Sequence, residues 1–237
     1  PANSYGSIKL TANWEINKYE VTIAVNNANW GSVSTTSVKD VPYGTTYSVT
    51  NNELTIGSTK VTASAKASAR FVNWTPATGT ITGATTITAN FEETVVVTLN
   101  IIKPAGSSAS YTFAEYASSS DAMNGTNAKQ TYAVSTEGTN ITKEIIVGKG
   151  YYLGITAKVS EGNTTTNSYE LLCMYEDGEL TTNMPVTSIS GKDNGNVEVT
   201  AAKSIKLEFF TAYKTALNPG TSSDSSKAYW EEVTVNK

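Results

Sequence analysis

Apolar and polar residues alternate along much of the chain, and this alternation predicts strands. The clearest run is residues 83–92, where Ile87, Ala89 and Phe91 take every second position, with threonine or asparagine between them. Successive side chains of a strand point to opposite faces, so this pattern is typical of a strand with one buried face. Many similar short runs follow one another, and they predict an all-β fold.

A second copy of this run lies near the N-terminus. Residues 10–15 correspond to residues 87–92, with Leu10 in the place of Ile87 and Trp14 in the place of Phe91. Self-similarity at a fixed spacing indicates repeated structural modules. We therefore expect each copy to be the closing strand of a module, and residues 1–15 to be the tail of a preceding repeat or a linker strand.

Residues 16–93 contain the signals of one complete small module. The sequence Gly57–Ser58 predicts a tight hairpin, and Pro42 belongs at a strand start or edge. The turn-forming residues 26–29 predict an antiparallel hairpin between the strands on either side. The expected strands are residues 8–14, 19–25, 30–34, 41–49, 53–56, 59–63 and 70–75, followed by a strand around Ile87 that ends the module near Glu93.

Several of these segments resemble one known family. They are Tyr19–Val25, Trp30–Ser34, Val41–Thr46, Phe71–Thr75 and Ile81–Phe91. Their aromatic-x-x-Trp strand, Tyr-Gly-Thr turn and Thr-x-Thr-Ala-Asn-Phe ending resemble the divergent internalin B-repeat, or Listeria–Bacteroides repeat. The resemblance covers residues 16–93, and Asn73 departs from it where the family usually has glycine. It implies a small β-grasp-like module, strung in tandem on secreted or wall-attached bacterial proteins as a non-catalytic spacer or adhesive element.

Residues 94–237 follow a different pattern, because no Tyr-Gly-Thr turn appears after Lys103–Gly106. Short strand-like runs separated by loops rich in Ser, Asn, Asp and Gly predict an antiparallel β-sandwich of unknown family. These runs are residues 111–116, 129–135, 142–147, 151–159, 168–176, 195–201, 204–213 and 229–235. We place the boundary between the two domains near residues 93–96.

Composition excludes several functions. The 237-residue chain has no histidine, which removes the commonest general base and zinc ligand. The net charge of −4 is mild and Arg70 is the only arginine, so we expect no nucleic-acid partner. No stretch approaches the ~20 apolar residues of a membrane span, so we expect no membrane insertion within this chain. Cys173 is the only cysteine and is expected in the core. No catalytic, cofactor or metal site is predicted.

Two sets of acidic residues could carry chemistry, and each also has an ordinary structural interpretation. Glu176–Glu179 and Asp193–Asn196 contain oxygen ligands suited to calcium, but Asp-Gly and Asn-Gly are routine in hairpin turns, which is the favoured interpretation. Glycosidases need two carboxyl groups facing each other. Glu170, Glu176 and Glu208 are the available acids in strands, and nothing in the sequence brings two of them together.

A covalent cross-link is a further hypothesis. Lys103 and Asn236 lie near the first and last strands of residues 94–237, where an isopeptide bond could join them with the help of a buried acid, Glu144 or Glu208. Lys103 precedes a proline and Asn236 lies at the C-terminus, so two solvated residues are the favoured interpretation.

Aromatic residues give the remaining clue to a binding site. Amphipathic rings favour interfaces, so five of them form a candidate platform for sugar rings or a partner protein. They are Tyr151, Tyr152, Tyr213, Tyr229 and Trp230. The alternative is that these rings are the core and edge of an ordinary β domain. Trp14, Trp30 and Trp74 are expected in the core of the module.

Together these patterns predict a non-catalytic, extracellular protein of the bacterial cell surface or cell wall. The repeat module would act as a spacer, because beads in tandem extend a chain away from its anchor. The β-sandwich would be the ligand-binding or adhesive part, with a host or matrix protein or a glycan as partner. The alternatives are a carbohydrate-binding module of a larger secreted enzyme, and pure structural spacing without a ligand.

Overall fold

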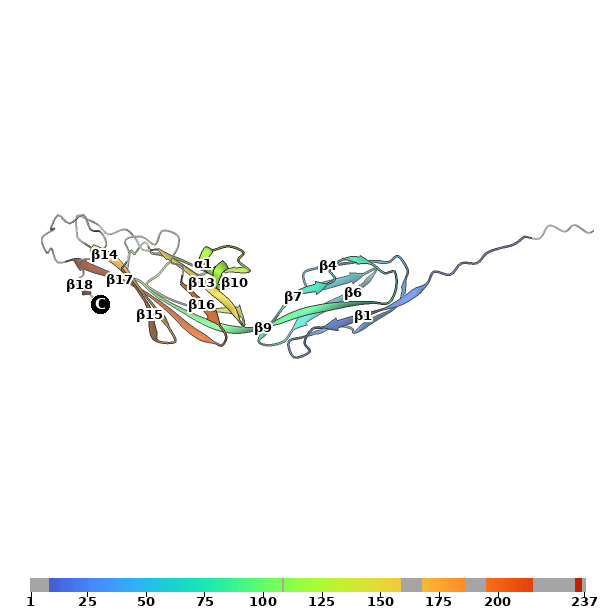
Figure 1. Ribbon diagram of the computed structural model, residues 1–237, viewed down its shortest axis with the longest axis horizontal. Coiled ribbons are helices and arrows are strands. Elements are labelled where there is room, and N and C mark those ends of the chain that lie inside the picture. The colour runs from blue at the N-terminus through green and yellow to red at the C-terminus, as the bar shows by residue number, and fades with distance from the viewer. Residues whose placement is uncertain (1–8, 108, 159–167, 186–194, 215–232, 236–237) are drawn as a thin grey trace, which may run out of the picture. The chain divides into compact units, whose positions relative to one another are not determined.

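The protein consists almost entirely of strands. The computed structural model describes residues 9–107, 109–158, 168–185, 195–214 and 233–235. These residues contain many strands and one short helix, which confirms the all-β prediction (Figure 1). The chain divides into two compact units, residues 1–92 and 93–237, and each unit has its own apolar core.

The first unit is built from two sheets. Its strands are β1 (Lys18–Val25), β2 (Gly31–Val33), β3 (Ser37–Pro42), β4 (Thr46–Thr50), β5 (Glu53–Ile56), β6 (Thr59–Ala65), β7 (Ala69–Thr75), β8 (Gly79–Thr80) and the first part of β9 (Thr85–Ile102). In one sheet β1 pairs antiparallel with β3 and parallel with β9, and β7 also pairs with β9. The other sheet has the order β2-β6-β5-β4-β8.

One core fills the space between these two sheets. Val21 on β1, Leu54 on β5 and Ile87 on β9 are fully buried, so both sheets contribute to it. The parallel register sets Ile23 beside Ile87, which brings the inward positions of β1 and β9 together. Burying an aliphatic side chain of this size stabilises the fold by about 1.5–3 kcal/mol, so the alternating pattern accounts directly for this sandwich.

The predicted hairpins of the first unit have different outcomes. The β5–β6 hairpin is confirmed, with Gly57 at a φ of +57° in the turn. Pro42 ends β3, the edge strand of its sheet, which agrees with the predicted edge position. The hairpin expected between β1 and β2 is wrong, because β2 pairs with β6 in the other sheet. The turn-forming residues 26–29 do redirect the chain, but they carry it across the core to the second sheet.

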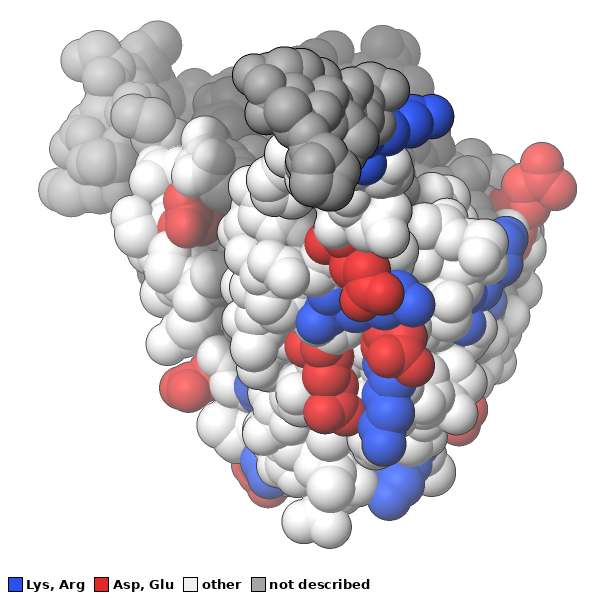
Figure 2. Space-filling view, turned by 90° about the vertical axis from the view of Figure 1, so that its right-hand side faces the viewer, with Lys and Arg blue, Asp and Glu red and all other residues white. Residues whose placement is uncertain are grey.

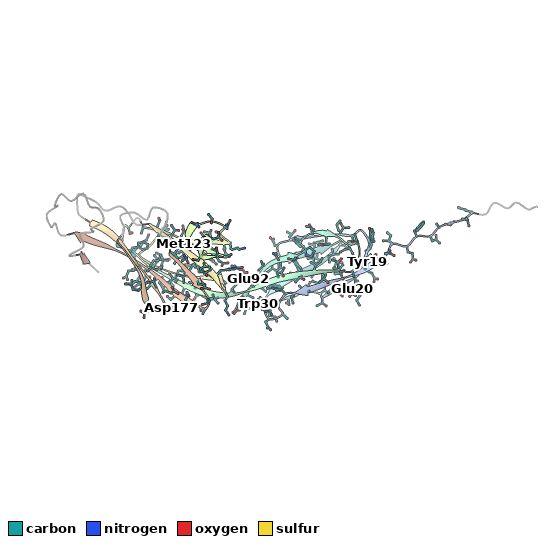
Figure 3. All side chains as sticks on the ribbon, in the orientation of Figure 1. Tyr19, Glu20, Trp30, Glu92, Met123 and Asp177 are labelled. Carbon is teal, nitrogen blue, oxygen red and sulfur yellow. The ribbon has the colours of Figure 1, made fainter. Side chains whose placement is uncertain are left out.

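The segment before β1 does not form the predicted strand. Residues 9–17 have no regular structure, and Leu10 and Trp14 are each 91% exposed. The chain before β1 runs out from the first unit as an extended segment (Figure 3). The segment joins the unit at Asn17, whose carbonyl accepts the backbone N–H of Tyr43 at 2.7 Å. Trp14 is therefore not part of the core of the first unit, in contrast to Trp74.

The second unit is also a two-sheet sandwich. Its elements are the second part of β9, β10 (Ser110–Tyr116), α1 (Ser119–Asn124), β11 (Gln130–Tyr132), β12 (Asn140–Gly148), β13 (Tyr151–Lys158), β14 (Ser168–Glu176), β15 (Glu179–Pro185), β16 (Gly195–Val199), β17 (Lys203–Lys214) and β18 (Val233–Val235). One sheet has the order β12-β9-β17-β14-β15, with β18 also paired to β17, and the other has the order β11-β10-β13-β16. Leu99, Phe113, Leu153 and Phe209 are among the buried residues between them.

The helix α1 was absent from the sequence prediction, although its ends carry ordinary signals. The Ser118 hydroxyl accepts the Asp121 N–H at 3.1 Å, and Gly125 ends the helix in the left-handed conformation. A serine followed three residues later by an acid, and a glycine just past the end, mark the two ends of a helix. The helix is short enough for an alternation search to overlook these signals.

Strand β9 belongs to both units. Its first part pairs with β1, its residues 94–102 pair antiparallel with β12, and residues 97–102 pair in parallel with β17. The strand therefore continues past Glu93, the residue near which we expect the first module to end. Residues 92–96 contain no glycine or proline, and two of them are valine, so nothing in the sequence interrupts the strand there.

Candidate functional site

The two described rings of the candidate aromatic platform lie next to each other on β13. Tyr151 pairs with Val199 and packs against the core of the second unit. Tyr152 pairs with Tyr116 on the neighbouring strand β10. Adjacent residues of a strand point to opposite faces, so Tyr151 and Tyr152 do not share one flat surface. Tyr151 fits the alternative interpretation, in which the ring belongs to the edge of a core.

The other members of the platform lie elsewhere in the chain. Tyr213 is on β17 and pairs with Ser168, in the sheet that does not contain β13. Tyr229 and Trp230 lie outside the described residues. The structure therefore places Tyr151 and Tyr152 on opposite faces of β13, and a platform that includes Tyr213, Tyr229 or Trp230 stays a prediction.

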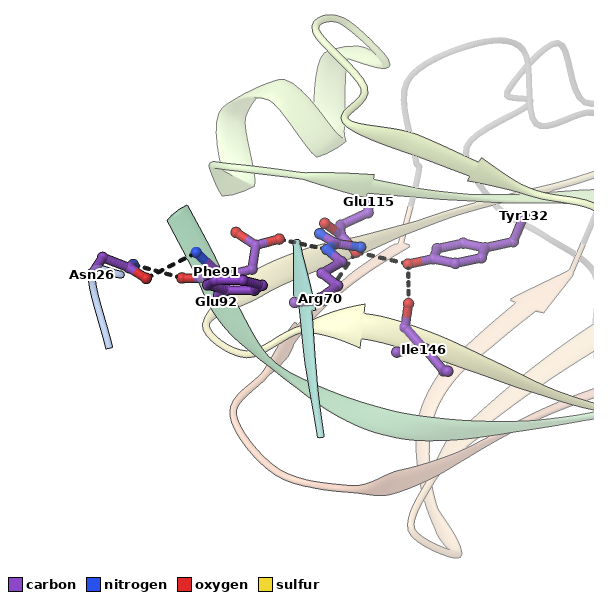
Figure 4. A network of polar contacts seen from close by, with 8 residues as sticks. Asn26, Arg70, Phe91, Glu92, Glu115, Tyr132 and Ile146 are labelled. Atoms are coloured by element: carbon purple, nitrogen blue, oxygen red, sulfur yellow. Dashed lines mark hydrogen bonds and ion pairs between the residues drawn. The ribbon is translucent and has the colours of Figure 1, made fainter. Parts of the chain in front are cut away.

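A buried polar network lies at one end of the second unit, and the sequence analysis missed it. Glu115 on β10 is 0% exposed, and its Oε2 accepts the Gly148 N–H at 3.0 Å and the Tyr132 hydroxyl at 2.7 Å (Figure 4). The Tyr132 oxygen also lies 2.8 Å from the Ile146 carbonyl. One carboxylate thus connects β10, β11 and β12. The sequence does indicate that Glu115 is buried, because it occupies the next inward-facing position of β10 after Tyr111 and Phe113.

Lys103 is also buried, which contradicts the interpretation that it is solvated. It is 8% exposed, and its Nζ donates to the Thr136 carbonyl. The Tyr111 hydroxyl donates to the adjacent carbonyl of Ser135, and burial raises the pKa of this hydroxyl. The Lys103 N–H is bound by the Thr139 carbonyl at 2.9 Å. These bonds hold the segment between β11 and β12, so Lys103 has a structural role here.

The acids named for a cross-link at Lys103 do not lie beside its ammonium group. Glu144 is exposed. Glu208 lies between the buried residues Leu207 and Phe209, so it faces away from the core into which Lys103 points. Asn236 lies outside the described residues. The structure therefore supplies no buried acid for this bond among the candidates from the sequence.

The first calcium candidate is a hairpin turn. Asp177 and Gly178 join β14 to β15 with φ angles of 50° and 89°, which confirms the turn interpretation. The carboxylate of Asp177 accepts the Ser204 N–H at 2.7 Å, and that of Glu176 pairs with Lys203. In the second candidate, Asp193 and Asn194 lie outside the described residues, whereas Gly195 and Asn196 begin β16.

The candidate catalytic carboxylates are engaged with lysines. Glu176 pairs with Lys203, and Glu208 lies 2.8 Å from Lys206, whose Nζ also sits 4.7 Å from the centre of the Tyr175 ring. The side chain of Glu170 and that of Cys173 lie outside the described part. Across the residues that the structure covers, no group of three or more Asp, Glu, Cys or His side chains could hold a metal ion.

The surface charge is mixed. On the face shown in Figure 2, acidic and basic side chains stand next to one another in a band, without a patch of a single sign. Such interspersed charges screen one another and do not attract a polyanion. A search of the described helices also finds none with the length and apolar character needed to cross a bilayer.

Comparisons with known proteins give little guidance. No family model and no curated protein sequence matches this chain. Similar solved structures include a mutant of the major pilin from Streptococcus pyogenes, with a TM-score of 0.26 and 8% identity over 81% of this chain and 97% of that chain. Another is the major pilin protein T-13 from Streptococcus pyogenes, with a TM-score of 0.24 and 7% identity over 82% of this chain and 97% of that chain. Scores this low do not show a shared fold and say nothing about function.

Proposed function

We propose that this chain is a non-catalytic part of an extracellular bacterial surface protein. In this proposal residues 16–93 are a B-repeat-like spacer module, and residues 94–237 are a β-sandwich that presents a ligand-binding or adhesive surface. The partner would be a host or matrix protein or a glycan. The main support is that the residues carrying the B-repeat resemblance are packing residues in the first unit.

Three of these residues illustrate the point. Trp74, from the aromatic-x-x-Trp strand, is 2% exposed. The Phe91 ring lies where a Cβ on Gly31 would have to be, so the Trp-Gly pair at the start of β2 leaves room for the closing strand. Ile81, at the start of the segment with the Thr-x-Thr-Ala-Asn-Phe ending, is 0% exposed. These motifs therefore specify the core of a stable folded module and carry no reactive group, as a spacer requires.

The side chains at the candidate catalytic positions also favour a non-catalytic role. General acid–base chemistry needs a carboxyl group free to exchange a proton with a substrate. Glu176 and Glu208 are instead each paired with a lysine, and Glu115 is buried with its Oε2 bound by two donors. A panel of glycoside and peptide substrates should give no turnover, and measurable hydrolysis would overturn this part of the proposal.

The ligand-binding role can be tested on the whole chain. We expect it to bind at least one protein in an array of host and matrix proteins, and a null result on a glycan array would then identify a protein as the partner. If an excess of the unlabelled protein competes for this binding, the result would support the adhesive function. A null result on both arrays would instead favour pure structural spacing.

The second candidate function is a carbohydrate-binding module of a larger secreted enzyme, for which Trp230 and its neighbouring tyrosines are the motivation. This function predicts a clear signal on the glycan array that Trp230→Ala removes. The matched control is Trp14→Ala, which removes an exposed ring from the other end of the chain. Sugar binding that survives Trp230→Ala would contradict the platform while leaving a glycan partner in place.

Cell-surface exposure is tested separately. Antibodies against the folded chain should label intact cells that express the parent protein, and brief protease treatment of those cells should remove the label. Labelling that requires permeabilised cells would contradict an extracellular location.

A further inference from the structure

The two copies of the closing-strand sequence have opposite environments. In β9, Ile87 is 0% exposed and Phe91 is 2% exposed. In residues 10–14, the corresponding Leu10 and Trp14 are each 91% exposed. Exposing two large apolar side chains in one short segment is costly, and contiguous exposed apolar residues mark interaction sites. The alternation of residues 10–14 is that of a strand, although the segment pairs with no strand among the residues that the structure describes.

The contacts of β9 show what a closing strand of this sequence needs. Ile87 and Ala89 pair in parallel with Ile23 and Val25 of β1. Just past β1, the Asn26 amide donates to the Phe91 carbonyl at 2.8 Å and accepts the Phe91 N–H at 2.9 Å (Figure 4). The amide binds backbone atoms only, so it would hold a tryptophan at that position equally well.

The outward positions of the two copies also match. Asn90 donates to Asn73 Oδ1 at 2.7 Å and to Thr75 Oγ1 at 2.9 Å, which ties the outer face of the closing strand to β7. Asn13 occupies the corresponding position of the exposed copy, and Thr11 corresponds to a threonine of β9. Residues 10–14 therefore keep both the inward apolar and the outward polar groups of a docked strand.

We propose that residues 10–14 are the closing strand of another β module of this kind. They dock in parallel with the first strand of that module, and Leu10, Ala12 and Trp14 take the core positions that Ile87, Ala89 and Phe91 take here. The partner is a module that supplies every strand except its last, with an amide side chain to bind the backbone at Trp14 and a glycine beneath the indole ring. The inference rests on the modular function proposed above.

A second copy of this chain is not the partner. In each copy the position for a closing strand is already filled by β9, whose Ile87 and Ala89 are both 0% exposed. A segment from another copy would have to displace a covalently connected strand, which has the advantage of high effective concentration. The partner is therefore a module that has the other strands of this fold and takes its closing strand from residues 10–14.

Strand β9 is one continuous strand shared by two units. The docked strand, in contrast, ends before β1, so residues 10–14 and β1 are separate strands. Six positions separate Phe91 from Val97, the next fully buried residue of β9, whereas seven separate Trp14 from Val21. A shift of one residue exchanges the two faces of a strand. Residues 15–17 must therefore break the alternation, and they form a joint between the docked strand and β1.

The test is hydrogen exchange measured by mass spectrometry on an extended chain. Residues 18–84 are fused directly before residues 8–237, so that residues 10–14 follow the copied segment as Ile87–Phe91 follow it in the natural sequence. In the original chain the amides of residues 10–14 should exchange at the rate of an open segment. In the extended chain they should exchange about 100-fold more slowly, approaching residues 87–91 of the same molecule, which serve as the internal reference.

Two variants of the extended chain make the result specific. Leu10→Asp with Trp14→Asp places charges at the inward positions and should abolish the protection of residues 10–14. Thr11→Asp places a single charge of the same sign at an outward position and should leave the protection within a few-fold of the unsubstituted extended chain. Equal loss in both variants would contradict the assigned faces.

Three outcomes would overturn the proposal. The first is fast exchange of residues 10–14 in the extended chain. The second is unchanged protection after Leu10→Asp with Trp14→Asp. The third is protection in the original chain that rises with concentration together with a dimer mass, which would make a second copy the partner. None of these measurements depends on where the protein resides or what it binds, so their failure is distinguishable from failure of the proposed function.

Discussion

The two units satisfy their polar groups in different ways. In the first unit, neutral amides bind backbone atoms: Asn26 holds Phe91, and Asn52 Nδ2 donates to the Ala63 carbonyl at 2.8 Å. In the second unit, charged groups are buried, with Glu115 at 0% and Lys103 at 8% exposure. Burying a charge is expensive unless several partners satisfy it, whereas Asn26 and Asn52 are exposed and avoid most of that cost. The first unit should therefore depend mainly on apolar packing, and the second also on the hydrogen bonds of a few buried ionisable side chains.

The largest effect should come from the apolar packing of the first unit. Phe91→Ala should lower the free energy of unfolding by about 3–5 kcal/mol, because it leaves a cavity above Gly31. Urea denaturation followed by the fluorescence of Trp30 and Trp74 measures this loss. Trp14→Ala is the matched control and should change the same free energy by less than about 0.5 kcal/mol, since its ring is 91% exposed. Equal effects of the two substitutions would contradict the assignment of the buried and exposed copies.

The next effect concerns the buried acid of the second unit. Glu115→Ala should cost about 3 kcal/mol, because the Tyr132 hydroxyl and the Gly148 N–H lose a buried acceptor. Glu115→Gln keeps the shape and one acceptor oxygen, and should cost less than half as much. Urea denaturation followed by circular dichroism compares the two variants. A loss of less than about 1 kcal/mol in the free energy of unfolding for Glu115→Ala would contradict the claim that the second unit depends on its buried ionisable side chains.

A smaller effect is expected at Lys103. Lys103→Met keeps the length of the side chain and removes the donor to the Thr136 carbonyl, so it should cost about 1–2 kcal/mol. The substitution should also speed hydrogen exchange in the segment between β11 and β12, which the lysine holds. Lys66→Met is the matched control, because its exposed Nζ also donates to a backbone carbonyl, that of Ala28 at 2.7 Å. A similar loss of unfolding free energy in both variants would show that the burial of Lys103 does not add to the stability of the fold.

The smallest effect concerns pH. Hydrogen bonds from Asn127 and Ser118 hold the pKa of Asp121 below its ordinary value. A lowered pKa in the folded state means that this carboxylate adds stability above its unfolded pKa of about 4, and that the stability is lost as the pH falls through the folded pKa. Asp121→Asn should therefore make the melting temperature fall slightly less steeply below about pH 4. An unchanged slope would contradict a role for this group in acid unfolding.

Much of the fold follows from alternation alone. The strand β14, Ser168–Glu176, has the bounds expected from the sequence, because its flanks are polar and its interior is apolar. The strand β15 was not predicted, since the run Glu179–Pro185 contains mostly polar residues and owes its conformation to pairing with β14. Pairing partners were harder to predict than strands. Turn chemistry showed that the chain changes direction after β1, but not that β2 joins the opposite sheet.

The candidate site was less predictable than the fold. Aromatic composition suggested a platform, but neighbouring positions on β13 send Tyr151 and Tyr152 to opposite faces, which a list of aromatic residues cannot reveal. The buried Glu115 could have been found, because its place in the inward series of β10 is visible in the sequence. Lys103 was misjudged for the same reason: it continues the inward series of Leu99 and Ile101, and this position outweighs its charge.

The continuity of β9 has a consequence for synthesis of the chain. The first unit lacks its final strand until residue 91 has left the ribosome, and the residues that follow at once are the opening strand of the second unit. Residues up to 102 then extend from an already folded bead, and β12 can pair with them long before β17 is translated. The earlier bead should thus act as a template for the later one, so nascent chains would acquire their sheets in a fixed order from the N-terminus.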